Sequence, residues 1–208
     1  MKELVIVGAG GFGREVAWLV EEINQKTPTW DIVGFVDDDK TVGHPINDYE
    51  IVGNTEWLMK QKMSVVIAIG HPDLRKESIK KLSASKNLYP TLIHPSVIHS
   101  NKVNIGEGTI ICANSVLTVN INIGKYVIVN LGCTIGHDVE IEDFVTVFPN
   151  VSISGGVLIG ECASVGTGSS IIQYTKIHKN AIIGAGAVVA ADIEGDGTYV
   201  GVPAVKIK

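Results

Sequence analysis

A six-residue repeat runs through the second half of this chain and constrains its fold more than any other feature. Fifteen consecutive hexads extend from Ile105 to Glu194 without an insertion, and the first position of every hexad is aliphatic. The position four residues later always holds a side chain that is small, β-branched or both. A repeat of this length predicts a parallel β-helix. The first positions are Ile105, Ile111, Leu117, Ile123, Val129, Ile135, Ile141, Val147, Ile153, Ile159, Val165, Ile171, Ile177, Ile183 and Val189.

The repeat assigns a direction to every side chain of the predicted β-helix. Three hexads make one turn of a triangular coil, so residues eighteen positions apart are expected to stack, with about 4.8 Å between adjacent coils. The first residue of each hexad and the residue four later are expected to point inward. All other residues are expected to face outward or to form corners. The pattern extends weakly upstream to Ile93 and His99, which predicts a frayed first coil.

The N-terminal part of the chain has no six-residue period and alternates between predicted strands and helices. This β-α-β-α-β-α order predicts a small parallel sheet with helices on its faces. Residues 1–90 are therefore expected to form an α/β domain, half of a Rossmann fold, and residues 91–208 a β-helix domain with a C-terminal tail. The expected strands are Lys2–Val7, Asp31–Val36 and Ser64–Ile69, and the expected helices are Arg14–Asn24, Thr55–Lys62 and Leu74–Lys86.

A glycine-rich turn separates the first predicted strand from the first helix. Gly8, Gly10 and Gly13 have the spacing of a phosphate-binding turn, in which the backbone approaches a phosphate at the N-terminus of a helix. An acidic cluster, Asp37-Asp38-Asp39, follows the second strand, where an acid can bind a ribose or a base edge. Since a dinucleotide needs both halves of the fold, a mononucleotide fits this domain better. The alternative is that the glycines only form a turn and the aspartates only a solvated loop.

Composition narrows the classes of partner. The net charge is −5 and no run of Lys or Arg stands out, which argues against a nucleic-acid binder. No apolar stretch has the length of a membrane span, and the N-terminus is better explained as a strand than as a signal peptide. The three cysteines are odd in number and lack metal-type spacing. Together these features predict a cytoplasmic protein.

His137 is the most informative polar residue of the repeat. It lies two residues after Ile135 and should therefore face outward. One coil later the stacking residue is Gly155, which leaves an open notch beside the imidazole. The next residue, Asp138, could orient the ring and stabilise its protonated form, as suits a general base. The alternative is an idle, exposed histidine, which is how we interpret His178 between two lysines.

Several motifs together resemble the hexapeptide-repeat acyltransferases. Within this family the chain is similar to the sialic-acid O-acetyltransferase type, a group that also contains the N-acetyltransferases of nucleotide-linked 4-amino-4,6-dideoxy sugars. The resemblance covers essentially the whole chain. It is carried by the hexads, IGHD at 135–138, SGG at 154–156, GVPA at 201–204, VGAGGFGRE at 7–15, GFVDDD at 34–39 and AIG at 68–70.

The resemblance implies a left-handed β-helix, a homotrimer, and acetyl-CoA bound between neighbouring prisms. It implies that His137 is the general base and that Asp138 orients it. The chain departs from the family at Phe12, where several amino-sugar members carry a histidine, so the sugar and the acetylated position stay open. Matched cofactor positions are Asn130, Gly155, Ala185, Gly201 and Pro203, and matched substrate positions are Gly10, Gly11, Phe12, Asp37, Asp38, Ile69 and Gly70.

The resemblance predicts transfer of acetyl from acetyl-CoA to the amine of a nucleotide-linked 4-amino-4,6-dideoxy sugar. One alternative is O-acetylation of a sialic acid or related sugar, and another is a scaffold that binds nucleotide sugars without catalysis. A metal-dependent protein of the γ-carbonic anhydrase type is a further alternative. His94 and His99 have the spacing of two of its ligands, but neither Asn130 nor Ile135, two coils later, supplies the third. No metal is therefore expected.

Overall fold

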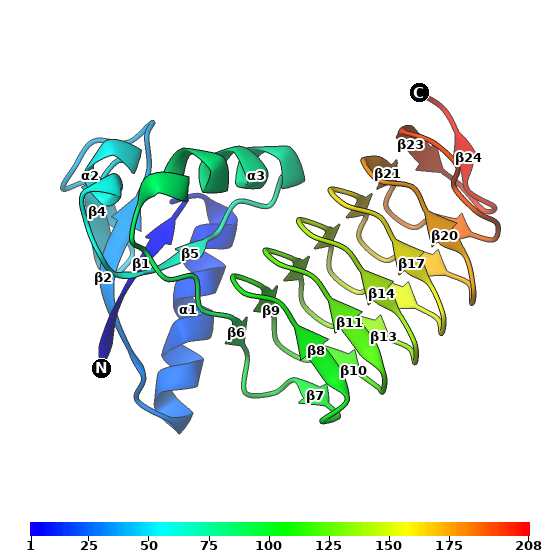
Figure 1. Ribbon diagram of the computed structural model, residues 1–208, viewed down its shortest axis with the longest axis horizontal. Helices are drawn as coiled ribbons and strands as arrows, with labels where there is room; N and C mark the ends of the chain where they lie inside the picture. The colour runs from blue at the N-terminus through cyan, green and yellow to red at the C-terminus, as the bar shows by residue number, and fades with distance from the viewer. The chain divides into compact units, whose positions relative to one another are not determined.

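The computed structural model describes residues 1–208 and divides into two compact units, Met1–Pro95 and Ser96–Lys208. The first unit holds all the α-helices and the second holds the coils of a parallel β-helix, whose strands follow one another in chain order (Figure 1). None of the helices combines the length and the apolarity that a membrane-spanning helix needs.

The first unit is built on a five-stranded sheet with the strand order β3-β4-β2-β1-β5. Strands β1, β2, β4 and β5 are parallel, and β3 pairs with β4 in the antiparallel sense. The elements are β1 (Lys2–Val7), α1 (Gly11–Lys26), β2 (Trp30–Val36), β3 (Pro45–Ile46), β4 (Tyr49–Gly53), α2 (Thr55–Met59), β5 (Ser64–Ile67), α3 (Pro72–Lys81), the 3₁₀ turn η1 (Leu82–Ala84) and β6 (Leu92–Ile93).

The interior strand β1 has buried side chains on both faces of the sheet. Val5 and Val7 pack into a core cluster with Leu58 of α2 and Leu82 of η1. Because side chains alternate along a strand, the fully buried Leu4 lies on the opposite face. The helix α1 contacts β1 and β2 and buries the apolar stripe that its sequence predicts.

The expected order of elements missed one hairpin of the first unit. Strands β3 and β4 lie between β2 and α2, and β4 extends the sheet beside β2. Ile51 of β4 is fully buried. The segment is short and is surrounded by Gly, Asn and Asp, so its brief alternation of apolar residues was indistinguishable from a loop.

Several expected element boundaries in the first unit were also wrong, and helix α1 spans Gly11–Lys26 rather than Arg14–Asn24. Helix α2 ends at Met59, well before Lys62, and β5 ends at Ile67 rather than Ile69. The expected helix Leu74–Lys86 is instead α3, Pro72–Lys81, followed by a tighter 3₁₀ turn. Proline at the start of α3 supplies a favourable first helical residue that the expectation had placed outside the helix.

The second unit contains three parallel sheets, one on each face of the coil, which we call sheets I, II and III. Sheet I contains β7 (Ile98–His99), β10 (Val116–Leu117), β13 (Thr134–Ile135), β16 (Ser152–Ile153), β19 (Ser170–Ile171) and β22 (Val188–Val189). Sheet II contains β8 (Val103–Ile105), β11 (Ile121–Ile123), β14 (Glu140–Ile141), β17 (Leu158–Ile159) and β20 (Lys176–Ile177). Sheet III contains β9 (Ile110–Ile111), β12 (Ile128–Val129), β15 (Thr146–Val147), β18 (Ser164–Val165), β21 (Ala181–Ile183), β23 (Gly197–Val200) and the antiparallel β24 (Val205–Lys206).

The eighteen-residue spacing of the coils is confirmed. Leu117 pairs with Ile135, and Ile135 pairs with Ile153, each eighteen residues further on. All first positions of the hexads are buried except Ile105, which is half-buried, and all residues four positions later are buried. The spacing fails only in the last coil, where Ile183 pairs with Tyr199, sixteen residues on.

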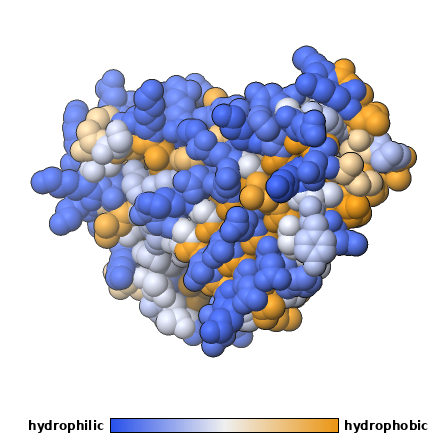
Figure 2. Space-filling view, turned by 45° about the vertical axis from the view of Figure 1, so that its right-hand side comes forward, coloured by the Kyte–Doolittle hydropathy of each residue, from blue (hydrophilic) through white to orange (hydrophobic).

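The corners between the sheets form three edges that run along the coils. We name them by the sheets they join in chain order: the I–II edge, the II–III edge and the III–I edge. From Gly108 to Gly186 each corner contains a residue in the left-handed backbone region, for example Asn120, Asp138 and Gly156 on the I–II edge. Asn, Asp and Gly tolerate this conformation best, so they recur at the corners. On the face of the molecule shown in Figure 2, hydrophilic side chains separate the hydrophobic patches of the surface.

All three cysteines are buried, and none of them forms a disulfide. Burial raises the pKa of the Cys133 thiol to about 11, because the thiolate would be poorly solvated. Cys133 occupies one of the inward positions of the repeat, and its side chain is completely inaccessible. A role as filler of the core is consistent with this environment.

Replacing Ile135 by alanine tests the inward assignment. Ile135 is buried inside the coil, so the Ile135→Ala variant should lose about 2–5 kcal/mol of unfolding free energy. The preceding Thr134 faces outward and is exposed, so Thr134→Ala should change the unfolding free energy by less than about 0.5 kcal/mol. Urea unfolding followed by circular dichroism measures both. Equal effects of the two substitutions would contradict the assignment.

Candidate functional site

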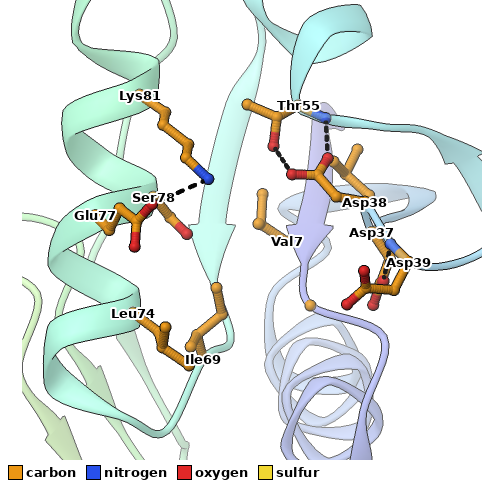
Figure 3. A pocket seen from close by; sticks show the side chains of 12 residues that line it. Val7, Asp37, Asp38, Asp39, Thr55, Ile69, Leu74, Glu77, Ser78 and Lys81 are labelled. Atoms are coloured by element: carbon orange, nitrogen blue, oxygen red, sulfur yellow. Dashed lines mark hydrogen bonds and ion pairs between the residues drawn. The ribbon is translucent and has the colours of Figure 1, made fainter.

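The first unit contains a cavity of about 300 Å³ at the carboxyl ends of β1, β2 and β5 (Figure 3). Ligands of open parallel sheets bind outside the carboxyl ends of the strands. One wall carries the acidic cluster, and the other carries side chains of α3. The lining residues are Val7, Gly8, Val36, Asp37, Asp38, Asp39, Thr55, Ile69, Leu74, Glu77, Ser78 and Lys81.

The glycine-rich turn leads from β1 into the N-terminus of α1. Gly8 has a φ of +98°, a value that favours glycine, and a side chain on Gly13 would collide with the carbonyl of Gly8. A Cβ on Gly10 would meet no atom within 4 Å, so the backbone there can be approached closely. Helix α1 begins at Gly11, and its free N–H groups could face an anion.

Asp37 and Asp38 accept hydrogen bonds from the turns that surround the cavity. The Asp37 carboxylate accepts hydrogen bonds from the N–H of Ala9 at 2.9 Å and of Asp39 at 3.0 Å. The Asp38 carboxylate accepts bonds from the N–H and the hydroxyl of Thr55, at 2.7 and 2.9 Å. Figure 3 shows the Asp38–Thr55 contacts at the rim of the cavity. Each carboxylate oxygen has a second lone pair, so both residues can still bind a ligand.

Not all the sequence-predicted substrate residues line this cavity. Asp37, Asp38 and Ile69 do, whereas Gly10, Gly11, Phe12 and Gly70 do not. Gly11 instead borders a shallow surface pocket, of about 380 Å³, with Arg14, Glu15, Trp18 and Asn47. Phe12 is half-buried at the start of α1.

Arg75 is a residue of this region that the sequence analysis missed. It lies on α3 and is only 1% exposed. Its Nη1 donates to the carbonyl oxygens of Ile69 at 2.6 Å and Gly70 at 3.1 Å, and so fixes the turn after β5. An arginine on a polar helix is usually exposed, so nothing in the sequence distinguished Arg75 from its solvated neighbours.

His137 and Asp138 lie on the I–II edge, in the turn that follows β13. The imidazole Nδ1 is 2.8 Å from Asp138 Oδ2, and both side chains are more than half exposed. Because an ionised carboxylate only accepts hydrogen bonds, Nδ1 carries the proton and Nε2 remains available as a base. Asn120, one coil earlier, donates to Asp138 Oδ1 at 3.1 Å. The hydrogen bonds from His137 and Asn120 lower the pKa of the Asp138 carboxyl.

Gly155 lies against the imidazole. A Cβ at this position would lie only 2.5 Å from His137 Cε1 and Nε2, so any side chain here would displace the ring. The N–H of the following Gly156 donates to the His137 carbonyl at 2.8 Å, which stacks the two coils. Glycine at position 155 is therefore required by the orientation of the imidazole.

The remaining predicted cofactor residues lie on a different edge. Asn130 follows β12 and Ala185 follows β21, so both are on the III–I edge. Gly201 and Pro203 lie in the turn between β23 and β24, and the Gly201 carbonyl accepts a hydrogen bond from Val188 N–H at 3.0 Å. Within one chain, sheet I separates this edge from His137. The structure therefore does not bring the two sets of residues together in a single chain.

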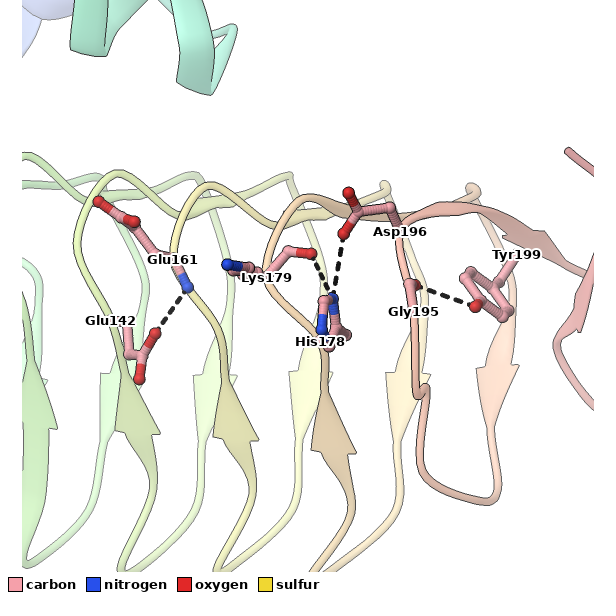
Figure 4. Close-up of polar contacts among 7 residues, drawn as sticks. All are labelled: Glu142, Glu161, His178, Lys179, Gly195, Asp196 and Tyr199. Atoms are coloured by element: carbon pink, nitrogen blue, oxygen red, sulfur yellow. Dashed lines mark hydrogen bonds and ion pairs between the residues drawn. The ribbon is translucent and has the colours of Figure 1, made fainter.

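His178 belongs to a second histidine–aspartate pair, on the II–III edge (Figure 4). Its Nδ1 is 2.8 Å from the carbonyl of Lys179 and 3.1 Å from the carboxylate of Asp196. From the sequence alone His178 was expected to be an isolated surface residue, and its partner Asp196 was not predicted. Asp196 follows it by eighteen residues, so the coil spacing could have found the pair.

The two histidines with metal-type spacing have unlike environments. His94 is buried, with its ring 5.2 Å from that of Trp18, and burial lowers its pKa. His99 is exposed and its Nδ1 contacts the carbonyl of Ser100. No group of three or more His, Cys, Asp or Glu side chains is placed to hold a metal ion.

Comparison with known proteins gives the class of this molecule. The PglD N-terminal domain matches residues 3–82. GDP-perosamine N-acetyltransferase of Escherichia coli O157:H7 is 30% identical over 187 residues, which are 87% of this chain and 82% of that protein.

Solved structures match the whole chain. One is a variant of perosamine N-acetyltransferase from Caulobacter crescentus, with a histidine replaced by asparagine, in complex with CoA and GDP-perosamine. It matches with a TM-score of 0.89 and 28% identity over 100% of this chain and 98% of that one. The acetyltransferase domain of PglB from Neisseria gonorrhoeae FA1090, in complex with acetyl coenzyme A, has a TM-score of 0.75 and 28% identity over 99% of each chain.

The chain belongs to the hexapeptide-repeat acyltransferases, in the type that groups sialic-acid O-acetyltransferases with nucleotide-4-amino-sugar N-acetyltransferases. The expected fold, a half-Rossmann domain followed by a left-handed β-helix, is confirmed. The protein is an acetyl-CoA-dependent acetyltransferase.

The hydrogen bonds of Asp37 predict a structural cost for its neutralisation. Asp37→Asn keeps one acceptor oxygen but turns an NH₂ group toward a backbone N–H, which should destabilise the fold by about 1–3 kcal/mol. The carboxylate of the neighbouring Asp39 makes no such contact, so Asp39→Asn is the matched control and should be neutral. Urea unfolding of both variants measures the difference, and equal stability of the two would show that the Asp37 contacts contribute nothing.

Proposed function

We propose that this enzyme transfers acetyl directly from acetyl-CoA to the amino group of a nucleotide-linked 4-amino-4,6-dideoxy sugar, with His137 as the general base. The observation that carries this proposal is the His137–Asp138 pair beside Gly155. The relative described as a GDP-perosamine N-acetyltransferase supports the choice of acceptor. The cavity at the carboxyl ends of β1, β2 and β5 would hold the nucleotide.

The proposed reaction needs one proton acceptor and one oxyanion donor. The amine attacks the thioester carbonyl, and His137 Nε2 takes a proton from the amine as the tetrahedral intermediate forms. The N–H of Gly155 donates no hydrogen bond within the chain, so it is free to stabilise the oxyanion. The C–S bond then breaks, CoA leaves as its thiolate, and the acetyl group remains on the amine.

A homotrimer would reunite the two sets of residues that sheet I separates. His137 and Gly155 lie on the I–II edge, whereas Asn130, Ala185 and Gly201 belong to the III–I edge and the C-terminal turn. In a closed ring of parallel prisms, the I–II edge of one chain can face the III–I edge of the next. Acetyl-CoA would then lie in the groove between two chains and contact both sets. We therefore propose that a single chain is inactive.

Replacing His137 should remove most of the activity. We expect His137→Ala to lower kcat by a factor of about 10²–10⁴, the usual contribution of a general base, with little change in affinity for acetyl-CoA. His178→Ala is the matched control, because it removes the other histidine of a histidine–aspartate pair. Steady-state kinetics with a nucleotide-linked amino sugar measure both. Near-normal turnover by His137→Ala would exclude the assignment.

Asp138→Asn should lower kcat because the amide NH₂ can face Nδ1 and favour the wrong tautomer of His137. The lowered pKa of Asp138 means that this carboxyl loses its proton below its ordinary range, and its orienting effect disappears only as the pH falls through that lowered value. The ratio of the natural to the variant kcat should therefore stay constant between about pH 5 and pH 8. A ratio that falls steeply in this range would show that Asp138 titrates there.

The substrate itself can be identified by a panel of UDP-, dTDP-, GDP- and CMP-linked sugars with acetyl-CoA. Mass spectrometry of the products from amino and hydroxy sugars separates N- from O-acetylation. We expect an increase in product mass only with an acceptor that carries a 4-amino group. Acetylation of a hydroxyl alone would favour the sialic-acid type of reaction, and binding without turnover would favour a scaffold.

A further inference from the structure

Two exposed apolar side chains lie on the I–II edge, two coils beyond the turn that carries His137. Tyr174 is 71% exposed and Ile172 is 36% exposed. Both belong to the turn between β19 and β20. The proposed reaction uses neither residue.

The backbone of Tyr174 is unusual for its position. Its φ is +61°, where the stacked positions of the same edge hold Asn120, Asp138 and Gly156. A bulky residue in this region is an outlier, and such strain tends to be kept where a side chain has a function.

Aromatic residues with positive φ occur elsewhere in the coil, but packing explains them. On the II–III edge the rings of Tyr126 and Phe144 stack at 5.2 Å with an angle of 17° between them. Each of these residues is only 8% exposed. Tyr174 has no comparable burial, so packing within the chain does not account for an aromatic residue there.

The Tyr174 ring lies over the same pair of glycines as the imidazole. A Cβ on Gly156 would lie 2.6 Å from Tyr174 Cε1, just as a Cβ on Gly155 would lie 2.5 Å from His137 Nε2. Tyr174 N–H donates to the Gly155 carbonyl at 3.0 Å, and Gly156 N–H donates to the His137 carbonyl at 2.8 Å. The Gly155-Gly156 segment therefore lies between an imidazole from the preceding coil and a phenol ring from the following coil.

The coil order places Tyr174 between the two ends of the proposed acetyl-CoA site. Counted from the coil of His137, Gly155 is one coil further and Tyr174 two coils further, and Ala185 lies between the second and the third coil further. With about 4.8 Å between coils, roughly 13 Å separates the level of His137 from that of Ala185. In a ring of parallel prisms these levels coincide between chains. An acetyl donor that contacts both Gly155 and Ala185 would therefore pass Tyr174.

We propose that the ring of Tyr174, with Ile172, contacts the pantetheine arm of acetyl-CoA and holds the thioester beside His137. This proposal rests on the proposed acetyl-CoA groove between two chains. The methylene groups of the arm can pack against an exposed aromatic face, and the contact needs no hydroxyl. Tyr174 is thus a binding residue for the acetyl donor and takes no part in proton transfer.

Tyr174→Asn tests this proposal without straining the backbone, because asparagine occupies the same position at Asn120 with a positive φ. We expect the Kd and the KM for acetyl-CoA to rise about three- to tenfold, with the KM for the sugar acceptor unchanged. Acetylpantetheine, which lacks the nucleotide, should lose the same factor. Tyr174→Phe keeps the ring and should behave as the natural chain.

Calorimetric titration with acetyl-CoA separates this proposal from the proposed function, because it needs no sugar. Failure of the natural chain to acetylate any amino sugar would overturn the acceptor assignment. In that case a higher Kd for acetyl-CoA in Tyr174→Asn would still support the contact between Tyr174 and the pantetheine arm. An unchanged Kd for acetyl-CoA would overturn the contact. The contact would also be overturned if Tyr174→Asn changed only the KM for the acceptor, or if it weakened the binding of acetyl-CoA but not of acetylpantetheine. Dissociation of the oligomer by Tyr174→Asn, measured by light scattering, would overturn it as well.

Discussion

The ladder of parallel hydrogen bonds between coils is the interaction on which the second unit depends. Most strands are only two residues long, and no coil could be stable alone. Each coil is held because its backbone groups pair with residues eighteen positions away and because its inward aliphatic side chains cover those of the next coil. The tight corners that close each triangle require left-handed residues, which explains the recurrent Asn, Asp and Gly.

The same ladder determines the surroundings of the proposed catalytic residues. The position two residues after the buried start of a hexad lies in a corner, so His137 can be exposed, and its partner comes from the corner itself. Asp138 occupies that corner in the left-handed conformation, and its carboxylate reaches the ring. The stacked residue of the next coil is Gly155, whose missing side chain makes room for the imidazole. The orientation of His137 thus depends on three successive coils, those of Asn120, Asp138 and Gly155.

The sequence predicted most of the β-helix because an aliphatic residue at every sixth position indicates directly which side chains are buried. It also predicted that Gly155 would lie beside His137, since stacking follows from counting. It failed where contacts depend on the path of a loop. The β3–β4 hairpin, the burial of Arg75 beneath the Ile69-Gly70 turn and the two-residue shortening of the last coil leave no periodic signal. The repeat also implies that Asn130 and His137 lie on different edges of the coil. This becomes clear only when each strand is assigned to one of the three sheets.

The uninterrupted run of hexads has a consequence for how this sequence can change during evolution. A single inserted residue within a strand would exchange the inward-facing and outward-facing side chains of that strand, whereas the gain or loss of a whole coil of eighteen residues leaves the inward and outward assignments intact. Such a change between His137 and Ala185 would leave each coil intact and yet move the two positions about 4.8 Å further apart or closer together. The number of coils therefore sets the distance between the two positions. If both contact one acetyl donor of fixed length, a variant with a different number of coils would fold but would bind the donor less well.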